Sequence, residues 1–434
     1  MAQKFQFHSE ITREPPVKQV TGYKLQNGLQ IVFLKKKQTP VVAVNLWYKV
    51  GSKDEKDGKS GFAHLFEHMM FEGSKNVAKS EHMKLINQVG GMVNGSTTQD
   101  RTNYWEVVPS NQLELALWLE ADRMHSLNIN EENFENQRAT VKEERRLRVD
   151  NQPYMRVVYE LKDETAYSNF AYKHSVIGSM QDLDNATLKD VRNFHDLYYR
   201  PNNAVLSLVG DFEVLEAVDL IEKHFSAIPR GPDVPKVDLT EPAKQSETRI
   251  TYQDQFAPFP AVLVSYHVPE RKNPDYYPIN LIEKIMFDGE SSRFYRRLVE
   301  EEQTALHVIG GEDGKIGPGL FFIFAQLNPQ KTLPDLLNLI DDEFSRLCNE
   351  QATEAEIRKA KNKVKSDFVG QEESVRTHAD MLSYYSTVFD NPAYYLSENN
   401  RYESIGAKDL LKTSEQYFRK ENRSVIEIIP KNSK

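Results

Sequence analysis

Cysteine is almost absent from this chain: Cys348 is the only one among 434 residues. A single cysteine excludes an internal disulfide framework and any zinc site built from several thiolates. A thiol nucleophile is also not expected, because no catalytic signature surrounds this residue. The chemistry of the protein must therefore come from other residue types.

Long apolar runs and an excess of positive charge are lacking as well. No apolar run approaches the roughly 18 residues needed to span a bilayer, and the polar start MAQKFQFHSEITREPP lacks the apolar core of a secretory signal. We therefore expect a soluble chain, periplasmic if a signal peptide has been removed and cytoplasmic otherwise. The net charge of -9 gives no general attraction to nucleic acid or anionic membranes. We expect neither nucleic acid binding nor membrane insertion.

Strand patterns and helix patterns follow each other in mixed order. Residues 23–50 alternate apolar and polar side chains around Asn27-Gly28, a strong hairpin signal, and end in the strand-like PVVAVNLWYKV. From Gly61 onward apolar residues recur at helical spacing, and further amphipathic helices are expected around 110–127 and 131–147. This mixture predicts an α+β fold.

The two halves of the chain resemble each other, which indicates an internal duplication. HLFEHMMFEG at 64–73 aligns without gaps on NLIEKIMFDG at 280–289. NEENFENQRATVKEE at 130–144 aligns in the same way on TEAEIRKAKNKVKSD at 353–367. Two homologous domains are therefore expected.

The proline-rich stretch IPRGPDVP, at 228–235, is typical of a linker between such domains. We therefore predict one domain at 1–232 and a second at 233–434. Each is expected to be a mostly antiparallel sheet packed with helices.

His64, Glu67 and His68 form the pattern His-x-x-Glu-His. Residues four apart lie on one face of a helix, so both imidazoles can reach one ion with Glu67 beside them. Zinc favours such ligands, and a catalytic zinc site keeps three protein ligands and one position for water. The helix expected around 131–147 offers adjacent carboxylates, Glu143 and Glu144, as candidates for the third ligand. We predict one Zn²⁺ per chain.

A histidine on a helix is more often a structural residue than a ligand. With 11 histidines in 434 residues, however, a chance match to the whole pattern is on the order of a few per cent. The apolar neighbours of the motif indicate a buried helix, where unpaired ionisable groups would be costly without a metal. Glu67 is then the expected general base, which takes a proton from water and passes it to the leaving amine.

The duplicated half lacks these metal-binding residue types. His64 is replaced by Asn280 and His68 by Lys284, and the position of Glu144 is taken by Asp367. A metal site is therefore expected in the first domain alone.

The motif HLFEH, with a glutamate 80 residues after its first histidine, resembles the pitrilysin or insulinase-like (M16) family of inverzincin peptidases. GFAHLFEHMMFEGS, GGMVNGSTTQDRTNYWEVVP, VKEERRLRVDNQPY and YYRPNNAVLSLVGDF are all similar to that family's first domain, and the resemblance covers nearly the whole chain. It implies a zinc metalloendopeptidase whose third ligand is Glu144 rather than Glu143. The length of the chain is similar to that of one branch of the family, which contains mitochondrial processing peptidases and small bacterial relatives. In that branch two subunits pair.

The resemblance also implies where a peptide substrate binds. The segment Met92 to Thr98 would be an edge strand to which an extended peptide adds through backbone hydrogen bonds. The residues implied in substrate binding are Val93, Asn94, Gly95, Ser96 and Thr97.

Two positions depart from the family's pattern. Gln137 stands where many members carry a second glutamate, seven residues before the third ligand. Glu300 and His307 stand where active single-chain relatives carry an arginine and a tyrosine that grip the substrate backbone. This implies a heterodimer with a homologous partner subunit that supplies the clamp, and a homodimer is the other possibility.

Two other functions are compatible with the same family. One is a non-catalytic structural subunit, as in the core proteins of a respiratory complex, and the other is a zinc-stabilised peptide-binding subunit without turnover. The complete set of His64, Glu67, His68 and Glu144 favours the enzyme.

Overall fold

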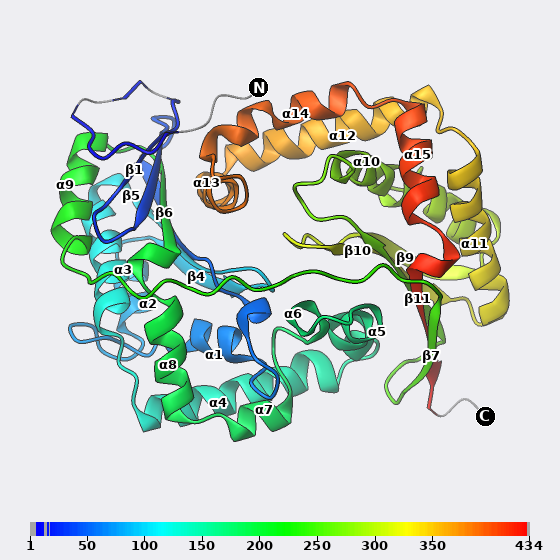
Figure 1. The fold of residues 1–434 in the computed structure, drawn as a ribbon, viewed down its shortest axis with the longest axis horizontal. Coiled ribbons are helices and arrows are strands. Elements are labelled where there is room, and N and C mark those ends of the chain that lie inside the picture. Colours follow the sequence, from blue (N-terminus) through cyan, green and yellow to red (C-terminus); the bar gives the residue numbers. More distant parts are fainter. Residues whose placement is uncertain (1–5, 13–14, 17, 432–434) are drawn as a thin grey trace. The chain divides into compact units, whose positions relative to one another are not determined.

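The computed structural model describes residues 6–12, 15–16 and 18–431, which form two compact units, each built on one sheet (Figure 1). The first unit takes the residues up to Glu143 together with Ser175–Val237 and Val369–Ser397. The second takes Glu144–His174, Asp238–Phe368 and the residues from Glu398 onward. Each unit therefore contains segments from both halves of the sequence.

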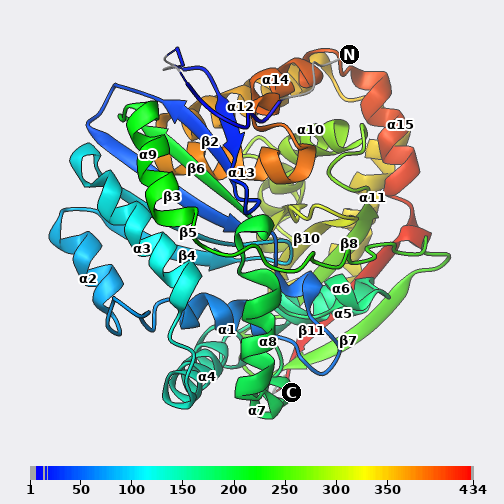
Figure 2. The ribbon, with the colours of Figure 1, turned by 60° about the vertical axis from the view of Figure 1, so that its left-hand side comes forward.

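The described residues of the first unit form a sheet of six strands in the order β1-β2-β6-β3-β5-β4. The strands are β1 (Thr21–Lys24), β2 (Gln30–Lys35), β3 (Val41–Tyr48), β4 (Met92–Thr97), β5 (Thr102–Pro109) and β6 (Ala204–Gly210). Strands β2 and β6 run parallel, and the other neighbours are antiparallel. Figure 2 shows β6, in green, between the blue strands β2 and β3. The order places β4 at one edge.

The β1–β2 hairpin forms where the sequence predicts it. Gly28 has a φ of 98°, the left-handed conformation that glycine adopts without strain in a tight turn. The side-chain amide of Asn27 donates to the carbonyl oxygens of Phe225 and Ile228. The turn is therefore fixed both by its own backbone and by a later helix.

Helices cover both faces of this sheet. They are α1 (Phe62–Met69), α2 (Glu81–Gln88), α3 (Leu113–Ser126), α4 (Glu131–Arg145), α7 (Met180–Asn185), α8 (Leu188–Tyr198), α9 (Val214–Phe225) and α13 (Val375–Phe389), with 3-10 turns at Ser52–Asp54, Ser110–Gln112, Pro201–Asn203 and Pro392–Tyr394. On one face, Val44, Leu46 and Leu208 belong to an apolar core shared with α1, α3 and α9. On the other, α13 packs on β3 and β6, where the hydroxyls of Ser207 and Ser383 lie 2.8 Å apart.

The second unit repeats this topology. Its strands are β7 (Thr248–Asp254), β8 (Ala261–Val268), β9 (Ala305–Glu312), β10 (Gly319–Leu327) and β11 (Arg423–Pro430). The order β7-β11-β8-β10-β9 matches β2-β6-β3-β5-β4, and β7 and β11 form the parallel pair. The predicted fold class, two duplicated α+β domains with mostly antiparallel sheets, is thus confirmed.

The second sheet also has helical cover on both faces. The helices are α5 (Lys162–Ala166), α6 (Phe170–Lys173), α10 (Tyr276–Phe287), α11 (Leu333–Asn349), α12 (Glu354–Glu373), α14 (Tyr395–Glu403) and α15 (Ala407–Tyr417), with π-helical turns η3 (Arg146–Asp150), η4 (Val157–Leu161) and η6 (Tyr295–Glu301) and a 3-10 turn at Lys420–Asn422. Val264 and Phe321 belong to a core with α10 and α11. Leu263 and Ile426 face the other way, against Val157 of η4.

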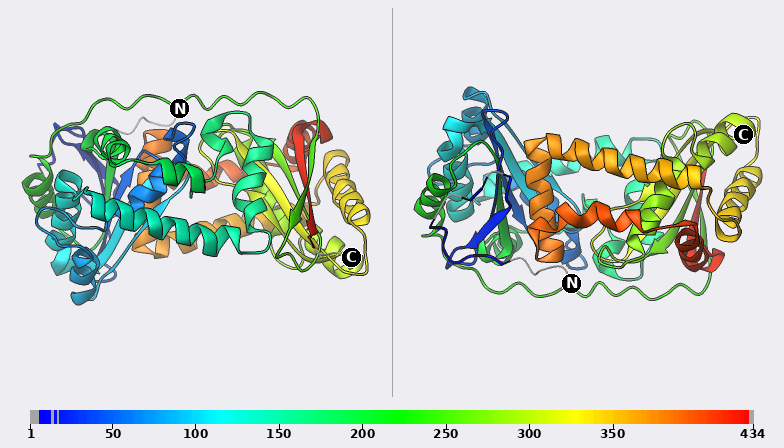
Figure 3. Two further views of the ribbon diagram at one scale, coloured as in Figure 1. Left: turned by 90° about the horizontal axis from the view of Figure 1, so that it is seen from below. Right: turned by 90° about the horizontal axis from the view of Figure 1, so that it is seen from above.

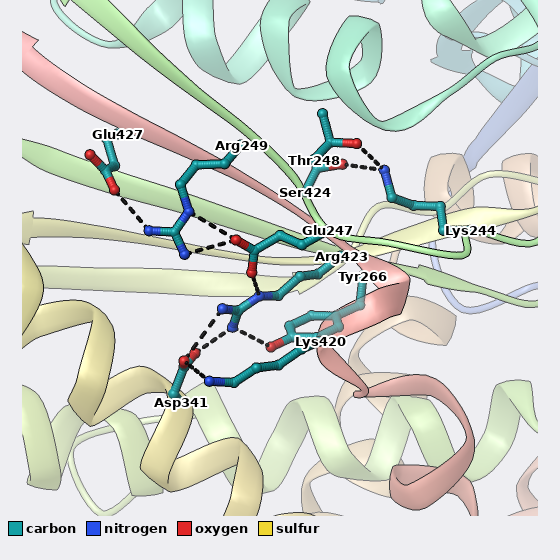
Figure 4. A network of polar contacts seen from close by, with 10 residues as sticks. All are labelled: Lys244, Glu247, Thr248, Arg249, Tyr266, Asp341, Lys420, Arg423, Ser424 and Glu427. Carbon is teal, nitrogen blue, oxygen red and sulfur yellow. Dashed lines mark hydrogen bonds and ion pairs between the residues drawn. The ribbon is translucent and has the colours of Figure 1, made fainter.

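A buried arginine joins several elements of the second unit (Figure 4). Arg423, at the start of β11, is 1% exposed, and its guanidinium donates to Glu247 at 2.7 Å and to the hydroxyl of Tyr266 at 3.3 Å. It also forms an ion pair with Asp341 of α11. A buried charge is tolerated only when it is paired in this way. The network therefore fixes β11, β8 and α11 together.

The predicted linker has no regular structure. The described segment 229–247 contains neither helix nor strand, and Figure 3 shows it as a long extended trace in green. Its prolines, at 229, 232, 235 and 242, cannot donate backbone hydrogen bonds to a helix or a sheet. The domain boundary at residue 232 stays a prediction.

The longest helix in the described part of the chain is α12, with 20 residues. Its sequence, EAEIRKAKNKVKSDFVGQEE, is charged along its whole length. Within residues 6–12, 15–16 and 18–431, no helix has both the length and the hydropathy of a membrane span.

Candidate metal centre

Specific contacts fix the N-terminus of α1, the helix that carries the histidine motif. Gly61 precedes α1 with a φ of 90°, and an added Cβ would lie 2.8 Å from the carbonyl oxygen of Ile177, so glycine is required there. The buried carboxylate of Glu55 accepts from the backbone N–H of Gly61 at 2.8 Å and of Ala63 at 2.7 Å. A negative charge at this end also complements the helix dipole. Glu55 therefore fixes where α1 begins.

The side chains of α1 divide between two faces. Phe62, Leu65, Phe66 and Met69 are buried in the apolar core, which holds the helix in place. The motif residues are half-buried on the other face. The local spacing thus presents the two imidazoles and the carboxylate of Glu67 away from the core, as the sequence predicts.

His64 and His68 of α1 lie close to Glu144 of α4. One ligand atom from each of the three residues lies within 4.8 Å of the others, and all three side chains are half-buried. The two imidazole rings are 4.9 Å apart between centroids, with their planes at 82°. Two imidazole nitrogens and one carboxylate oxygen are the donor set of many catalytic zinc sites, so these residues fit the ion. Their role as ligands stays a prediction.

The structure distinguishes the two adjacent glutamates of α4. Glu144 is half-buried beside the histidines, whereas Glu143 is exposed. Glu144 also forms an ion pair of 3.0 Å with Arg148, one turn further along, whose side chain is 75% exposed. Helix geometry points adjacent residues about 100° apart, so Glu143 and Glu144 cannot both face α1.

Glu67 contacts the edge strand β4. The hydroxyl of Thr97 donates to Glu67 Oε2 at 2.6 Å. A Cβ on Gly95 would lie 3.2 Å from Glu67 Cγ, so this glycine allows the side chain to approach the strand closely. Neither contact could be predicted from the sequence, because both join residues about 30 positions apart in the chain.

The residues implied in substrate binding all lie on β4, at the edge of the first sheet. Asn94 is exposed, and Val93, Gly95, Ser96 and Thr97 are half-buried. No strand pairs with the outer side of β4 among the described residues. Their role in binding a peptide stays a prediction.

The two departures from the family's pattern lie in different settings. Gln137 of α4 donates to the carboxylate of Glu72 at 2.7 Å, and Lys79 pairs with the same carboxylate at 2.6 Å. Glu300, in η6, and His307, on β9, are both exposed in the second unit. Gln137 thus donates a hydrogen bond to the buried carboxylate of Glu72, which lies on another segment of the chain.

A second group with metal-ligand spacing was not found from the sequence. His82 of α2 and Glu106 of β5 are 2.9 Å apart, and both lie within 4.8 Å of Glu120 on α3. The guanidinium of Arg123 pairs with Glu120 and lies 3.7 Å from Glu106. All four side chains are buried. Arg123 already supplies the positive charge that these carboxylates need, so we interpret this group as a structural ion cluster.

Burial sets the protonation of this cluster. It lowers the pKa of His82 to about 3, so the imidazole is neutral at pH 7. Burial raises the pKa of Glu120 from its ordinary 4.5 to about 8; the charge of Arg123 opposes this rise, and the charge of Glu106 adds to it. The folded protein therefore keeps a proton on Glu120 that the unfolded chain releases above its ordinary pKa of 4.5.

Glu120 should make the protein less stable at alkaline pH. Its stabilisation is complete below pH 4.5 and is lost as the pH rises to about 8. The variant E120Q cannot ionise, so its stability should fall less than that of the wild type between about pH 5 and pH 9, by on the order of 2 kcal/mol. Thermal unfolding of metal-free protein in chelator measures this difference. Parallel curves for the two proteins would contradict the assignment.

The counterpart of the metal centre in the second unit holds an internal cation. The ammonium of Lys284, at the position of His68, lies 3.2 Å from Glu283 and 3.4 Å from Asp367. Burial alone would lower the pKa of Lys284, but these carboxylates raise it above its ordinary value. Asn280 accepts a hydrogen bond of 3.2 Å from the hydroxyl of Tyr402. The lysine thus neutralises the two acids without a metal.

Removing this cation should destabilise the second unit. In K284M the carboxylates of Glu283 and Asp367 lose a shared partner, and we expect a loss of about 1 kcal/mol, because all three groups are partly exposed. Thermal unfolding should show a decrease of about 2 °C in Tm. K363M is the matched control, since Lys363 also pairs with Asp367, at 3.0 Å, but is 44% exposed. An equal loss in both variants would show that Lys284 has no special role.

Comparison with known proteins supports the same family for both halves. The family model described as Insulinase (Peptidase family M16) matches residues 30–180, and the one described as Peptidase M16 inactive domain matches residues 185–364. A beta subunit of the mitochondrial-processing peptidase from Bos taurus is 24% identical and covers 80% of this chain and 71% of its own. The first match lies within the first half of the chain, whereas the second begins at residue 185 of the first half and continues across the linker to residue 364.

A bacterial relative is more similar. The protein named Zinc protease PqqE from Helicobacter pylori is 31% identical over 411 residues, which is 94% of this chain and 92% of its own. The crystal structure of a protease from Helicobacter pylori superposes with a TM-score of 0.91 at 30% identity, covering 96% of this chain and all of that one. Both the sequence and the fold therefore match along nearly the whole length. The chain belongs to the insulinase family of peptidases, M16.

Proposed function

We propose that this protein is a zinc metalloendopeptidase with one zinc ion per chain. The observation that carries the proposal is the approach of His64, His68 and Glu144 to within 4.8 Å of one another, from two helices. These residues would hold the ion, and Glu67 stands beside the two histidines on the same face of α1. The relative from Helicobacter pylori, named a zinc protease, supports this proposal.

The proposed reaction is hydrolysis of a peptide bond by a metal-activated water. The chemistry that zinc supplies at such a site is activation of water, whose pKa falls toward about 7, and polarisation of the scissile carbonyl. The carboxylate of Glu67 takes the proton from the water and delivers it to the leaving amine. The hydroxyl of Thr97 donates to this carboxylate at 2.6 Å. A covalent intermediate with the protein is not required.

A peptide or an unfolded segment is the substrate class that we propose. An extended chain can add to the outer side of β4 through backbone hydrogen bonds, which give affinity with little dependence on sequence. The peptide would then run along residues 93–97, beside Glu67. A short peptide or an unfolded segment can adopt the extended conformation that this pairing needs.

We further propose a dimer in which a homologous partner supplies the substrate clamp. Glu300 and His307 replace the arginine and tyrosine of active single-chain relatives, and neither can donate the bidentate hydrogen bonds of a guanidinium. The relative from Bos taurus is named as a beta subunit, which supports a divided function. A homodimer would leave both clamps incomplete.

Zinc analysis combined with a peptide-library digest tests the proposal. The purified chain should contain one zinc and should cleave peptides when a homologous subunit from the same organism is added, with less cleavage by either chain alone. Light scattering reports whether the two chains associate. Stoichiometric zinc without cleavage in either case would favour a peptide-binding subunit. Absence of zinc would favour a structural subunit.

A further inference from the structure

Side chains of β4 form hydrogen bonds with other residues on both faces of the strand. Successive side chains of a strand point to opposite faces, so Thr97 and Ser96 diverge. Thr97 donates to Glu67 Oε2 at 2.6 Å on one face. On the other, the hydroxyl of Ser96 donates to Asn103 at 2.7 Å, and Arg101 donates to the backbone carbonyl of Ser96 at 2.7 Å. β4 is an edge strand that pairs with β5, and these side-chain hydrogen bonds hold it further in place.

The face with Ser96 is anchored to a distant part of the sequence. Asn103 of β5 donates to the carboxylate of Asp380 at 3.0 Å, and Asp380 stands on α13. The guanidinium of Arg101 also lies 5.2 Å from the ring centroid of Trp47. These contacts fix the position of β4 relative to the sheet.

The face with Thr97 contacts the proposed general base. Gly95, two residues earlier on the same face, contributes no side chain, and its backbone lies against the stem of Glu67. The Thr97 hydroxyl is therefore the polar group of β4 that reaches the carboxylate on this face. A hydrogen bond from a hydroxyl to an ionised carboxylate is short and about twice as strong as one between neutral groups.

We propose that Thr97 is a positioning residue, which couples the peptide-accepting strand to the orientation of Glu67. This inference rests on the proposed function, because it concerns how the general base meets the bound peptide. A peptide on β4 takes its register from the backbone of the strand, and the base takes its direction from a side chain of that strand. The position of the bound peptide and the direction of the general base are thereby both set by β4. A displacement of about 1 Å can lower a rate by about 100-fold, so this coupling matters for the chemical step.

The variants T97V and T97S separate the hydroxyl from the shape of the side chain. Valine keeps the β-branched shape that suits a strand, and serine keeps the hydroxyl. We expect kcat to fall by about 10- to 100-fold in T97V, with KM within about two-fold of the wild type. T97S should retain kcat within about three-fold. The control T251V makes the same exchange at an exposed position of β7 and should leave kcat and KM unchanged.

A merely structural role would give a different pattern. If Thr97 only stabilised the strand, T97V would raise KM together with its effect on kcat, and T97S would share part of that loss. A kcat of T97V within about two-fold of the wild type, or an equal loss in T97S, would overturn the inference. Zinc content should stay at one per chain in every variant.

A crystal structure of T97V distinguishes this inference from the proposed function. If the wild type cleaves no peptide under any condition, the proposed function is wrong, but the coupling can still be judged from the coordinates. The Glu67 carboxylate should leave its wild-type position in T97V and keep it in T97S. A carboxylate that stays in place in T97V would overturn the coupling, whatever the activity of the wild type.

Discussion

The variant E67Q should bind one zinc ion per chain and cleave peptides at least about 1,000-fold more slowly than the wild type. Glutamine has nearly the same shape as glutamate, but its amide cannot take a proton from water. The zinc content should not change, because His64, His68 and Glu144 remain. Steady-state cleavage of a fluorogenic peptide and metal analysis of the same sample measure both quantities.

The duplication offers a matched control for this variant. Glu283 occupies the position of Glu67 in the second unit, where its carboxylate accepts from the backbone N–H of Glu312 at 3.2 Å and pairs with Lys284. E283Q makes the same chemical change without touching the proposed base, so its kcat should stay within about two-fold of the wild type. Cleavage by E67Q at the wild-type rate would exclude Glu67 as the base. Equal losses in both variants would point to stability instead.

The variant E144Q should lose zinc, with an affinity more than about 100-fold below that of the wild type. A neutral amide oxygen is a much weaker zinc ligand than a carboxylate, and two histidines alone leave the ion with too few protein ligands. Activity should fall in parallel and should recover in part when zinc is added in excess. Competition with a chelator of known affinity gives the dissociation constant.

E143Q is the control for this variant, because Glu143 is the adjacent residue on the same helix and is exposed. It removes the same charge from α4 but leaves the three proposed ligands, so zinc affinity should change by less than about three-fold. If E143Q lost zinc and E144Q kept it, the third ligand would be the other glutamate. If neither lost zinc, α4 would not contribute a ligand.

The exchange of segments between the two units could not be predicted from the sequence. Helix α13 comes from the second half of the chain but packs on β3 and β6 of the first unit, through Ser383 and Asp380. In the second unit, η4 comes from the first half and covers Leu263 and Ile426. The sequence of these segments does not show which of two similar sheets receives them, because both sheets offer a second face to be buried.

The buried ion cluster was missed for a similar reason. His82, Glu106 and Glu120 stand on three different elements, and none of them shows ligand spacing along the sequence. Burial and the proximity of Arg123 decide their charge states. Such proximity is a property of the packed fold.

Local patterns were enough to predict the duplicated α+β fold and the arrangement of His64, Glu67 and His68, because helical and strand periodicities fix which side chains share a face. The residue pattern left Glu143 and Glu144 open, and the family resemblance favoured Glu144; the tertiary structure brings Glu144 close to the histidines and decides that Thr97 contacts Glu67. It also decided that Lys284 pairs with Asp367. These pairings join residues far apart in the chain, and their distances are set by how the elements pack.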